Sequence, residues 1–220
     1  MNKKDTVVFD LDGTLLDTLE DLKNSVNYAM TQCVYPEHTL DEVRRYVGNG
    51  ILLLMQRAIP GGKDDPNFDK AFTLFKEHYG KHCNDTTKPY AGIMELLHTL
   101  KENNIKIAIV SNKADFAVKE LNAIYFKDLI PVAIGEKESE GIRKKPAPDT
   151  VIEALKQLGS TAENSVYIGD SDVDIETAAN AGMDCLSVSW GFRDIPFLKE
   201  HKASRIVSSP RELGDIILQR

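Results

Sequence analysis

The chain has 220 residues, of which 42% are hydrophobic and 28% charged, so it can form an ordinary globular core, either as one large domain or as one domain with a substantial insertion. Its formal net charge is −7, its pI is about 5.3, and its longest basic run is residues 143–145. A protein that grips nucleic acid by its phosphates normally presents a basic face. The composition therefore argues against a nucleic-acid partner, but not against a small anionic one.

The sequence shows no sign of a membrane segment or a secretory signal. No apolar run approaches the ~20 residues that span a bilayer. The apolar stretch near the start, residues 7–9, is too short for a signal peptide. Three cysteines lie far apart without a Cys-x-x-Cys pair, which fits a reducing compartment: Cys33, Cys83 and Cys185. We therefore expect a cytoplasmic protein with no membrane partner.

Runs of β-branched and aromatic residues predict a series of short buried strands. The first is Thr6–Phe9, followed by Asp10, and the second is residues 106–110, followed by Ser111. Four more are predicted at residues 130–134, 165–168, 185–188 and 205–207. Helical periodicity between them predicts helices at residues 91–103, 114–124, 148–158, 172–181 and 210–219. This alternation implies right-handed crossovers and a parallel sheet with helices on both faces.

The segment between the first two strands breaks this alternation. From Thr18 to Thr87 the pattern is helical, with predicted helices at residues 19–33, 40–46, 51–58 and 68–81. A crossover between parallel strands needs only about a dozen residues. The expected architecture is therefore a Rossmann-like α/β core, residues 1–17 and 88–220, with a small all-helical domain, residues 18–87, inserted after the first strand.

The chemically informative residues gather in four segments at the carboxyl ends of the strands. Such ends form the ligand-binding crevice of an open parallel sheet. Buried carboxylates are costly unless they are paired or bind a metal, so a core alone does not require several of them. The segments are Asp10–Thr14, Ser111–Lys113, Lys145–Pro146 and Gly169–Asp174.

These residue types match the needs of phosphoryl transfer: a nucleophile, neutralisation of phosphoryl charge and a proton for the leaving oxygen. Asp10 could attack phosphorus and share a Mg²⁺ ion with Asp170, because Mg²⁺ takes oxygen ligands. Asp12 could serve first as general acid and then as base. Ser111 could donate a hydrogen bond to a phosphoryl oxygen, and Lys145 could place a positive charge on it.

The same segments resemble the motifs of the haloacid dehalogenase superfamily of phosphohydrolases, in the same order and over nearly the whole chain. The resemblance implies Asp10 as the nucleophile, Asp12 as the acid and base, and Ser111 and Lys145 as clamps on the phosphate. The matching stretches are Phe9–Thr18 (FDLDGTLLDT), Ile109–Lys113 (IVSNK), Lys144–Asp149 (KKPAPD) and Gly169–Asp174 (GDSDVD).

The resemblance also implies a metal site. The Mg²⁺ ion would be held by Asp10, Asp170 and the main-chain carbonyl of Asp12. Asp174 would contact these ligands without touching the ion, or would reach the ion through a water molecule. A glycine after Asp12 would let the chain turn sharply beside the phosphate. Further candidate contacts to the substrate in these motifs are Gly13, Thr14 and Asn112.

The inserted helical domain resembles the small cap of this superfamily, hinged at its two attachment points. Residues 42–50 resemble the cap signature of phosphoglycolate phosphatases, and residues 187–193 resemble the segment after their last core strand. Arg45 and Asn49 are the candidate substrate contacts in the cap. Adjacent helical residues point in different directions, so at most one of Arg44 and Arg45 faces the cleft. The Gly-Asn-Gly sequence around residue 49 can equally be a simple break between two helices.

Several polar residues have plain structural alternatives. Ser111 and Asn112 could cap the helix that begins near residue 114. Structural roles are expected for a further set: a helix cap for Asp172, packing for Trp190, and a surface or core position for His78 and His82.

The leading function is therefore a Mg²⁺-dependent phosphatase acting on a small phosphorylated acid, with 2-phosphoglycolate as the best candidate. A phosphosugar mutase and a pyrophosphatase are alternatives on the same scaffold, because the core motifs do not separate them. The intact polar set disfavours a non-catalytic binding protein. A dehalogenase is disfavoured because Asp12 would have no leaving oxygen to protonate. The amphipathic inserted helices suit a lid or a subunit interface, so a monomer and a homodimer are both open.

Overall fold

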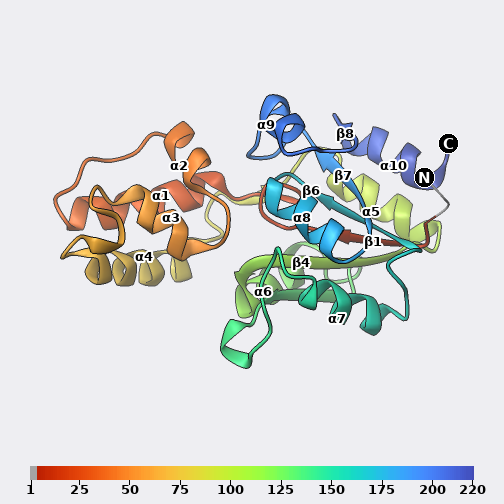
Figure 1. Ribbon diagram of the computed structural model, residues 1–220, viewed down its shortest axis with the longest axis horizontal. Coiled ribbons are helices and arrows are strands. Elements are labelled where there is room, and N and C mark those ends of the chain that lie inside the picture. The colour runs from red at the N-terminus through yellow and green to blue at the C-terminus, as the bar shows by residue number, and fades with distance from the viewer. Residues whose placement is uncertain (1–3) are drawn as a thin grey trace. The chain divides into compact units, whose positions relative to one another are not determined.

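The computed structural model describes residues 4–220 and divides into two compact units. The α/β unit joins the residues up to Leu15 to Pro89–Arg220, and the helical unit is Leu16–Lys88. Figure 1 shows the first as a sheet flanked by helices and the second as a group of helices. Among the described residues, no helix is both long enough and apolar enough to cross a membrane.

The α/β unit is built on a six-stranded sheet in which every paired strand runs parallel to its neighbour. In spatial order, the strands are β5 (Val132–Glu136), β4 (Lys106–Ala114), β1 (Thr6–Phe9), β6 (Ser165–Gly169), β7 (Asp184–Val188) and β8 (Ile206–Val207). All four residues of β1 are buried, as expected for a strand that is paired on both edges and covered on both faces. The predicted α/β fold class is thus confirmed.

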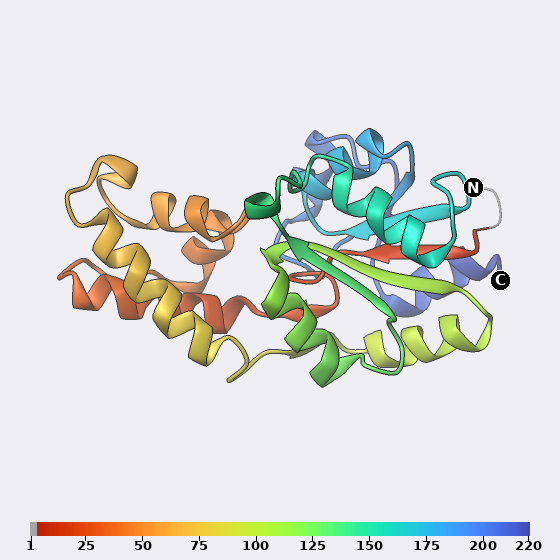
Figure 2. The same ribbon diagram turned by 90° about the horizontal axis from the view of Figure 1, so that it is seen from below.

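Helices cover both faces of this sheet. In Figure 2, α7 lies on one side of the sheet, whereas α5 and α6 lie on the other. The helices of the unit are α5 (Ile93–Glu102), α6 (Asp115–Tyr125), α7 (Asp149–Leu158), α8 (Asp172–Asn180), α9 (Ile195–Glu200) and α10 (Pro210–Leu218). The sequence pattern does not predict α9, because six residues are too few to display a helical period.

The register of the three central strands brings distant residues to one edge. Phe9, the last residue of β1, is aligned with Ile109 of β4 and Ile168 of β6. The residues that follow each of these positions therefore emerge together at the carboxyl edge of the sheet. Asp10 and Asp170 both lie there.

Strand β4 continues past its predicted end. The sequence pattern predicts its end at Val110, but the strand extends to Ala114. Between these two residues its register against β5 shifts. Ser111 and Lys113 are buried, whereas the residue between them is only half-buried. Ser111 and Lys113 therefore share one face of an extended segment.

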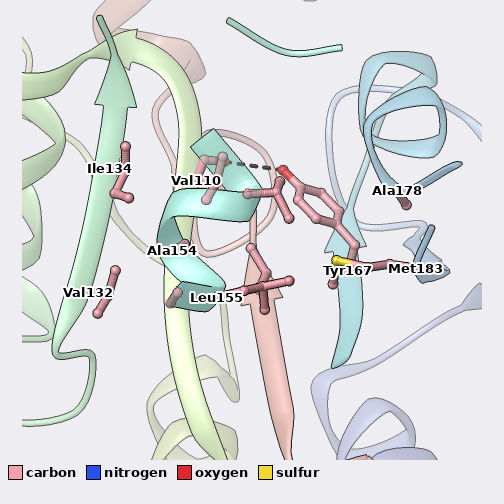
Figure 3. Packing of buried hydrophobic residues seen from close by; sticks show 11 residues of the cluster. Val110, Val132, Ile134, Ala154, Leu155, Tyr167, Ala178 and Met183 are labelled. Atoms are coloured by element: carbon pink, nitrogen blue, oxygen red, sulfur yellow. Dashed lines mark hydrogen bonds between the residues drawn. The ribbon is translucent and has the colours of Figure 1, made fainter. Parts of the chain in front are cut away.

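A cluster of buried side chains packs the central strands against α7 and α8 (Figure 3). Alternate positions of the strands supply it, as expected for one face of a sheet. The cluster also holds a hydroxyl group, that of Tyr167, which donates a hydrogen bond to the carbonyl of Val110 at 3.2 Å. Its members are Val8, Ala108, Val110, Val132, Ile134, Val151, Ala154, Leu155, Tyr167, Ala178 and Met183.

The helical unit consists of four α-helices and one short 3-10 helix, Gly62–Asp64, joined by loops. The α-helices are α1 (Leu19–Gln32), α2 (Leu40–Tyr46), α3 (Ile51–Ala58) and α4 (Phe68–His82). Two short strands, β2 (Leu16–Asp17) and β3 (Lys88–Pro89), pair with each other where the chain enters and leaves the unit. The sequence pattern does not predict these strands, because a two-residue strand has no measurable alternation.

One buried carboxylate ties the first helix of this unit to its last residues. Asp21 is 1% exposed and accepts hydrogen bonds from the amides of Thr86, at 3.0 Å, and Thr87, at 2.9 Å. The hydroxyls of the same two threonines donate to it at 2.6 and 2.7 Å. Asp21 therefore satisfies donors at the point where the chain returns to β3.

Candidate active site

At the carboxyl end of β1, the carboxylate of Asp10 meets the amine of Lys145. The Lys145 Nζ atom lies 2.9 Å from Asp10 Oδ1 and 2.8 Å from Asp174 Oδ1, and its side chain is 3% exposed. Burial alone would lower the pKa of Lys145, but the two carboxylates outweigh burial and hold this pKa well above its usual value. The amine therefore places a positive charge beside Asp10.

Asp170 directly follows β6 and is enclosed by the backbone of two other segments. Its Oδ2 atom accepts a hydrogen bond from the Phe192 amide at 2.6 Å, and Thr14 Oγ1 lies 3.4 Å from Oδ1. A Cβ at Gly13 would lie 2.5 Å from Asp170 Oδ2, and a Cβ at Gly191 would lie 2.3 Å from Asp170 Cβ. Gly13 also has a φ of +85°, so it is required both for the turn and for the space that Asp170 occupies.

Asp174 is fully buried in the first turn of α8 and uses both oxygens. Oδ1 accepts from Lys145, while Oδ2 accepts from the amides of Asp170 and Ser171, at 3.2 and 3.1 Å. The Ser171 hydroxyl donates to the same oxygen at 2.6 Å. The expectation that Asp172 caps this helix is wrong, because Ser171 occupies the N-cap position and Asp172 is the first helical residue.

Three carboxylates form a compact acidic cluster. Asp10, Asp170 and Asp174 each offer an oxygen, and these oxygens lie within 4.8 Å of one another. Burial, followed by the two neighbouring carboxylates, raises the pKa of Asp170 well above its usual value. Burial also raises the pKa of Asp10 to about 7, against the attraction of Lys145. A further cation would favour the ionised form of all three carboxylates, and their all-oxygen donor set fits a hard divalent ion.

Asp12 has a cationic partner outside the predicted set of site residues, Lys113. Lys113 Nζ lies 3.1 Å from Asp12 Oδ1 and 3.4 Å from Oδ2. The Lys113 side chain is 5% exposed and that of Asp12 19%. Lys113 lies two residues beyond Ser111 on the same face of β4, so a strand extending past Ser111 would have predicted its position.

Ser111 and Asn112 do not cap α6. The helix begins at Asp115, and no side chain makes a capping hydrogen bond at its start. Ser111 is 3% exposed, and its hydroxyl accepts from the Lys113 amide at 3.2 Å. Asn112 Nδ2 donates to the carbonyl of Lys145 at 2.9 Å. Asn112 therefore ties β4 to the loop that carries Lys145.

The basic run 143–145 separates into three different environments. Arg143 forms a two-pronged ion pair with Asp149, at 3.0 and 2.7 Å. Lys144 pairs with Glu138 at 2.9 Å. Of the three basic residues, Lys145 is the buried one.

Trp190 also contacts the loop after β1. Its indole Nε1 donates to the carbonyl of Thr14 at 3.0 Å, so it does more than pack. Thr14 is fully buried, and its hydroxyl faces Asp170. The segment around Trp190 therefore fixes the loop that carries Gly13 and Thr14.

The other candidate residues lie in the helical unit. Arg45 Nη2 is 3.2 Å from Asp41, and the Arg45 side chain is 66% exposed. Asn49 has a φ of +63° and lies between two glycines that also have positive φ, in the break between α2 and α3. His78 and His82 stack on each other with ring centroids 4.3 Å apart. The Gly-Asn-Gly sequence therefore separates two helices, and a substrate contact by Asn49 stays a prediction.

The sequence that carries these residues matches a known family. A profile described as "haloacid dehalogenase-like hydrolase" matches residues 7–188. The chain belongs to the haloacid dehalogenase-like hydrolase family. The matched range includes Asp10, Asp12, Lys145 and the acidic residues after β6, so the resemblance predicted from the four motifs is confirmed.

Several similar proteins are named phosphoglycolate phosphatases. A phosphoglycolate phosphatase of Aquifex aeolicus is 32% identical over 190 residues, which cover 84% of this chain and 85% of that protein. A phosphoglycolate phosphatase of Pseudomonas putida is 29% identical over 94% of this chain and 77% of its own. The crystal structure of a candidate phosphoglycolate phosphatase from Lactobacillus delbrueckii subsp. bulgaricus has a TM-score of 0.91 and 36% identity, covering 99% and 100% of the two chains. The expected enzyme class, a phosphatase of this family, is confirmed.

Proposed function

We propose that this chain is a Mg²⁺-dependent phosphatase that forms a phospho-aspartate at Asp10. The observation that carries the proposal is the 2.9 Å contact between Lys145 Nζ and Asp10 Oδ1 beside two further buried carboxylates. A carboxylate that attacks an anionic phosphoryl group needs fixed positive charge beside it. Lys145 supplies one such charge, and the acidic cluster provides ligands for a second.

The first half of the reaction transfers the phosphoryl group to the enzyme. A carboxylate oxygen of Asp10 bonds to phosphorus while the bond from phosphorus to the leaving oxygen breaks. Asp12 gives its proton to that oxygen, so the product leaves as a neutral alcohol. Lys145 and Ser111 donate hydrogen bonds to the phosphoryl oxygens.

The second half returns the enzyme to its starting state. Asp12, now ionised, takes a proton from a water molecule as the water oxygen bonds to phosphorus. The bond between phosphorus and the Asp10 oxygen breaks, which regenerates the Asp10 carboxylate and releases inorganic phosphate. One residue can therefore act as acid and then as base in the two halves.

The acidic cluster defines the proposed metal ligands. Asp10 and Asp170 would hold Mg²⁺ with the main-chain carbonyl of Asp12. Asp174, whose oxygens already accept from Lys145 and from the amides of Asp170 and Ser171, would support these ligands without being the main contact to the ion. When bound, the ion supplies Lewis-acid neutralisation of phosphoryl charge.

The best substrate candidate is 2-phosphoglycolate, a small phosphorylated acid. The support is the name shared by relatives that are 29% and 32% identical over most of this chain. We propose the helical unit Leu16–Lys88 as the cap that selects the substrate, with Arg45 and Asn49 as its candidate contacts. A cap that closes over the site and opens for product release would exclude water during transfer.

Purified protein tests the proposal directly. Turnover of p-nitrophenyl phosphate should require Mg²⁺ and stop with EDTA, and a panel of phosphorylated metabolites should give the highest kcat/KM for 2-phosphoglycolate. Asp10→Asn should abolish turnover without much loss of thermal stability, whereas Asp128→Asn, at an exposed site in the same unit, should have no effect. Retained turnover in Asp10→Asn would exclude Asp10 as the nucleophile. Transfer of phosphate to a sugar, or a preference for pyrophosphate, would favour the alternative functions.

A further inference from the structure

We infer that Tyr167 is a positioning residue whose buried hydroxyl orients the ammonium group of Lys145 toward Asp10 and an incoming phosphoryl group. The inference rests on the proposed function, because the orientation of this amine matters only if phosphoryl transfer occurs at Asp10. Tyr167 lies outside the four motifs of the sequence analysis. In sequence it looks like an ordinary aromatic residue of a buried strand.

The phenol connects two separate segments of the site. Tyr167 is on β6, is fully buried, and its hydroxyl lies 3.0 Å from Lys145 Nζ and 3.2 Å from the carbonyl oxygen of Val110 on β4. Strand β1 lies between β6 and β4 in the sheet, so the side chain reaches across β1 (Figure 3). Val110 directly precedes Ser111. The hydroxyl therefore links the amine of Lys145 to the strand that carries Ser111.

Chemistry fixes the direction of both hydrogen bonds. A carbonyl oxygen can only accept, and an ammonium group can only donate. The phenol therefore gives its one proton to Val110 and accepts a hydrogen bond from Lys145. Its apolar neighbours include Val8, Val151 and Met183, among which a phenylalanine ring would fit equally well. The packing therefore requires only an aromatic ring at position 167, and the role of the hydroxyl lies in its hydrogen bonds to Val110 and Lys145.

The contacts of Lys145 form a tripod. An ammonium group has three N–H donors, and the three acceptors within reach are Tyr167 Oη, Asp174 Oδ1 and Asp10 Oδ1, at 3.0, 2.8 and 2.9 Å. The Tyr167 hydroxyl is itself fixed by the Val110 carbonyl, and Asp174 is fixed by the amides of Asp170 and Ser171. Two rigid acceptors fix two N–H directions, and these determine the third.

The third N–H group of Lys145, which faces Asp10, is the one that takes part in the proposed reaction. In the proposed first step, a carboxylate oxygen of Asp10 becomes bonded to phosphorus, and the phosphoryl oxygens arrive beside Lys145. The N–H group that had faced Asp10 can then donate to a phosphoryl oxygen without a large movement of the amine. If the Tyr167 hydroxyl were removed, the buried carboxylate of Asp174 would be the remaining fixed acceptor, and the ammonium group could rotate about that single contact.

The test variant is Tyr167→Phe in the full chain, which keeps the ring and removes the hydroxyl. We expect kcat/KM to fall about tenfold, the range for loss of a hydrogen bond to a charged group. The fall should be equal for p-nitrophenyl phosphate and an alkyl phosphate, because Lys145 acts on the phosphoryl oxygens and not on the leaving group. The Kd of inorganic phosphate should rise by a similar factor in calorimetric titration.

Thr6→Val is the matched control. The Thr6 hydroxyl is also fully buried, but it bonds with Asp5 and Ser160 at 2.7 Å, at the opposite end of β1. Its loss should lower thermal stability and leave kcat/KM and phosphate affinity unchanged. This control separates the cost of losing a buried hydroxyl from an effect on the site.

A double-mutant cycle on phosphate binding completes the test and needs no turnover. In a Lys145→Met background, adding Tyr167→Phe should change the Kd of inorganic phosphate less than twofold. An effect of equal size in both backgrounds would overturn the inference, as would wild-type kcat/KM in Tyr167→Phe. Failure of Tyr167→Phe to fold would also overturn it, because the hydroxyl would then serve the fold. A wild-type protein with no phosphatase activity would instead refute the proposed function.

Discussion

The amine of Lys113 lies 3.1 Å from Oδ1 of Asp12, which joins the extended end of β4 to the loop after β1. In the proposed mechanism, Asp12 first protonates the leaving oxygen and later deprotonates water. The carboxyl group of Asp12 must therefore keep the same orientation in both steps. A buried amine on a strand is a fixed partner for this purpose.

Replacement of Lys113 should slow the step in which the leaving group departs. We expect Lys113→Met to lower kcat/KM about tenfold for alkyl phosphates, whose leaving oxygen needs a proton, and much less for p-nitrophenyl phosphate. Steady-state kinetics on both substrates measures the difference. Lys119→Met is the control, because Lys119 pairs with Asp115 at 2.6 Å but is 59% exposed. Equal slowing of both substrates by Lys113→Met would contradict a role through Asp12.

Adding one methyl group at Gly191 should damage the site by displacing Asp170. The new Cβ would lie 2.3 Å from Asp170 Cβ and 2.4 Å from the carbonyl of Gly13, so one of these segments must move. We expect Gly191→Ala to reduce kcat at least 100-fold, since misplacement by about 1 Å can have that effect. Gly80→Ala is the control, because a Cβ there meets no atom within 4 Å beyond the backbone of its own helix, and it should leave kcat unchanged. Near-normal activity of Gly191→Ala would show that this close packing is not required.

Metal binding should be visible in stability as well as in activity. Because Asp10, Asp170 and Asp174 lie so close together, a divalent ion that neutralises them should bind the folded chain and raise its Tm. The Tm in MgCl₂ should exceed the Tm in EDTA, and the difference should grow with the logarithm of the Mg²⁺ concentration. In Asp170→Asn the gain should be largely lost. An identical Tm in MgCl₂ and EDTA for the wild type would argue against this metal site.

The stability of the helical unit should depend on Asp21. We expect Asp21→Asn to destabilise it by about 2 to 3 kcal/mol, because the new amide group would face donors from Thr86 and Thr87. Urea unfolding followed by circular dichroism measures this change. Asp64→Asn, at an exposed site in the same unit, should cost nothing measurable.

The same variant predicts a change in the acid dependence of stability. Burial opposes the ionisation of Asp21, but the hydrogen bonds from Thr86 and Thr87 outweigh burial and lower its pKa. A carboxyl whose pKa falls on folding stabilises the fold above its unfolded pKa of about 3.9, and this stabilisation is lost as the pH falls through the folded pKa. Asp21→Asn should therefore lose less stability than the wild type below about pH 4. Parallel curves for the two proteins would contradict this assignment.

The sequence predicts much of this architecture because the information is local. Thr6–Phe9 is β-branched or aromatic at every position and ends at Asp10, which identifies a central strand and its carboxyl end together. The motif after β6 identifies Asp170 in the same way. Once strand ends are assigned, parallel topology brings their polar residues to one edge.

The remaining features depend on contacts between distant segments. The sequence pattern predicts Tyr167 to be a core residue, and only the fold shows that its hydroxyl lies 3.0 Å from Lys145. Lys113 follows Ser111 in a stretch that the pattern ends too early, since the register shift in β4 leaves no signal in composition. Gly191 is one glycine among 14, and its need to be small follows from Asp170, 21 residues before it.

If Asp10 is the nucleophile, phosphate becomes covalently attached to it during turnover, and mass spectrometry can detect this intermediate. Asp12→Ala should still accept phosphate from p-nitrophenyl phosphate, whose leaving group needs no proton, but should hydrolyse the intermediate slowly. Rapid acid quenching and peptide sequencing should then place one phosphate on Asp10. Phosphate on another residue, or no attached phosphate although p-nitrophenolate is released in a burst, would contradict the account.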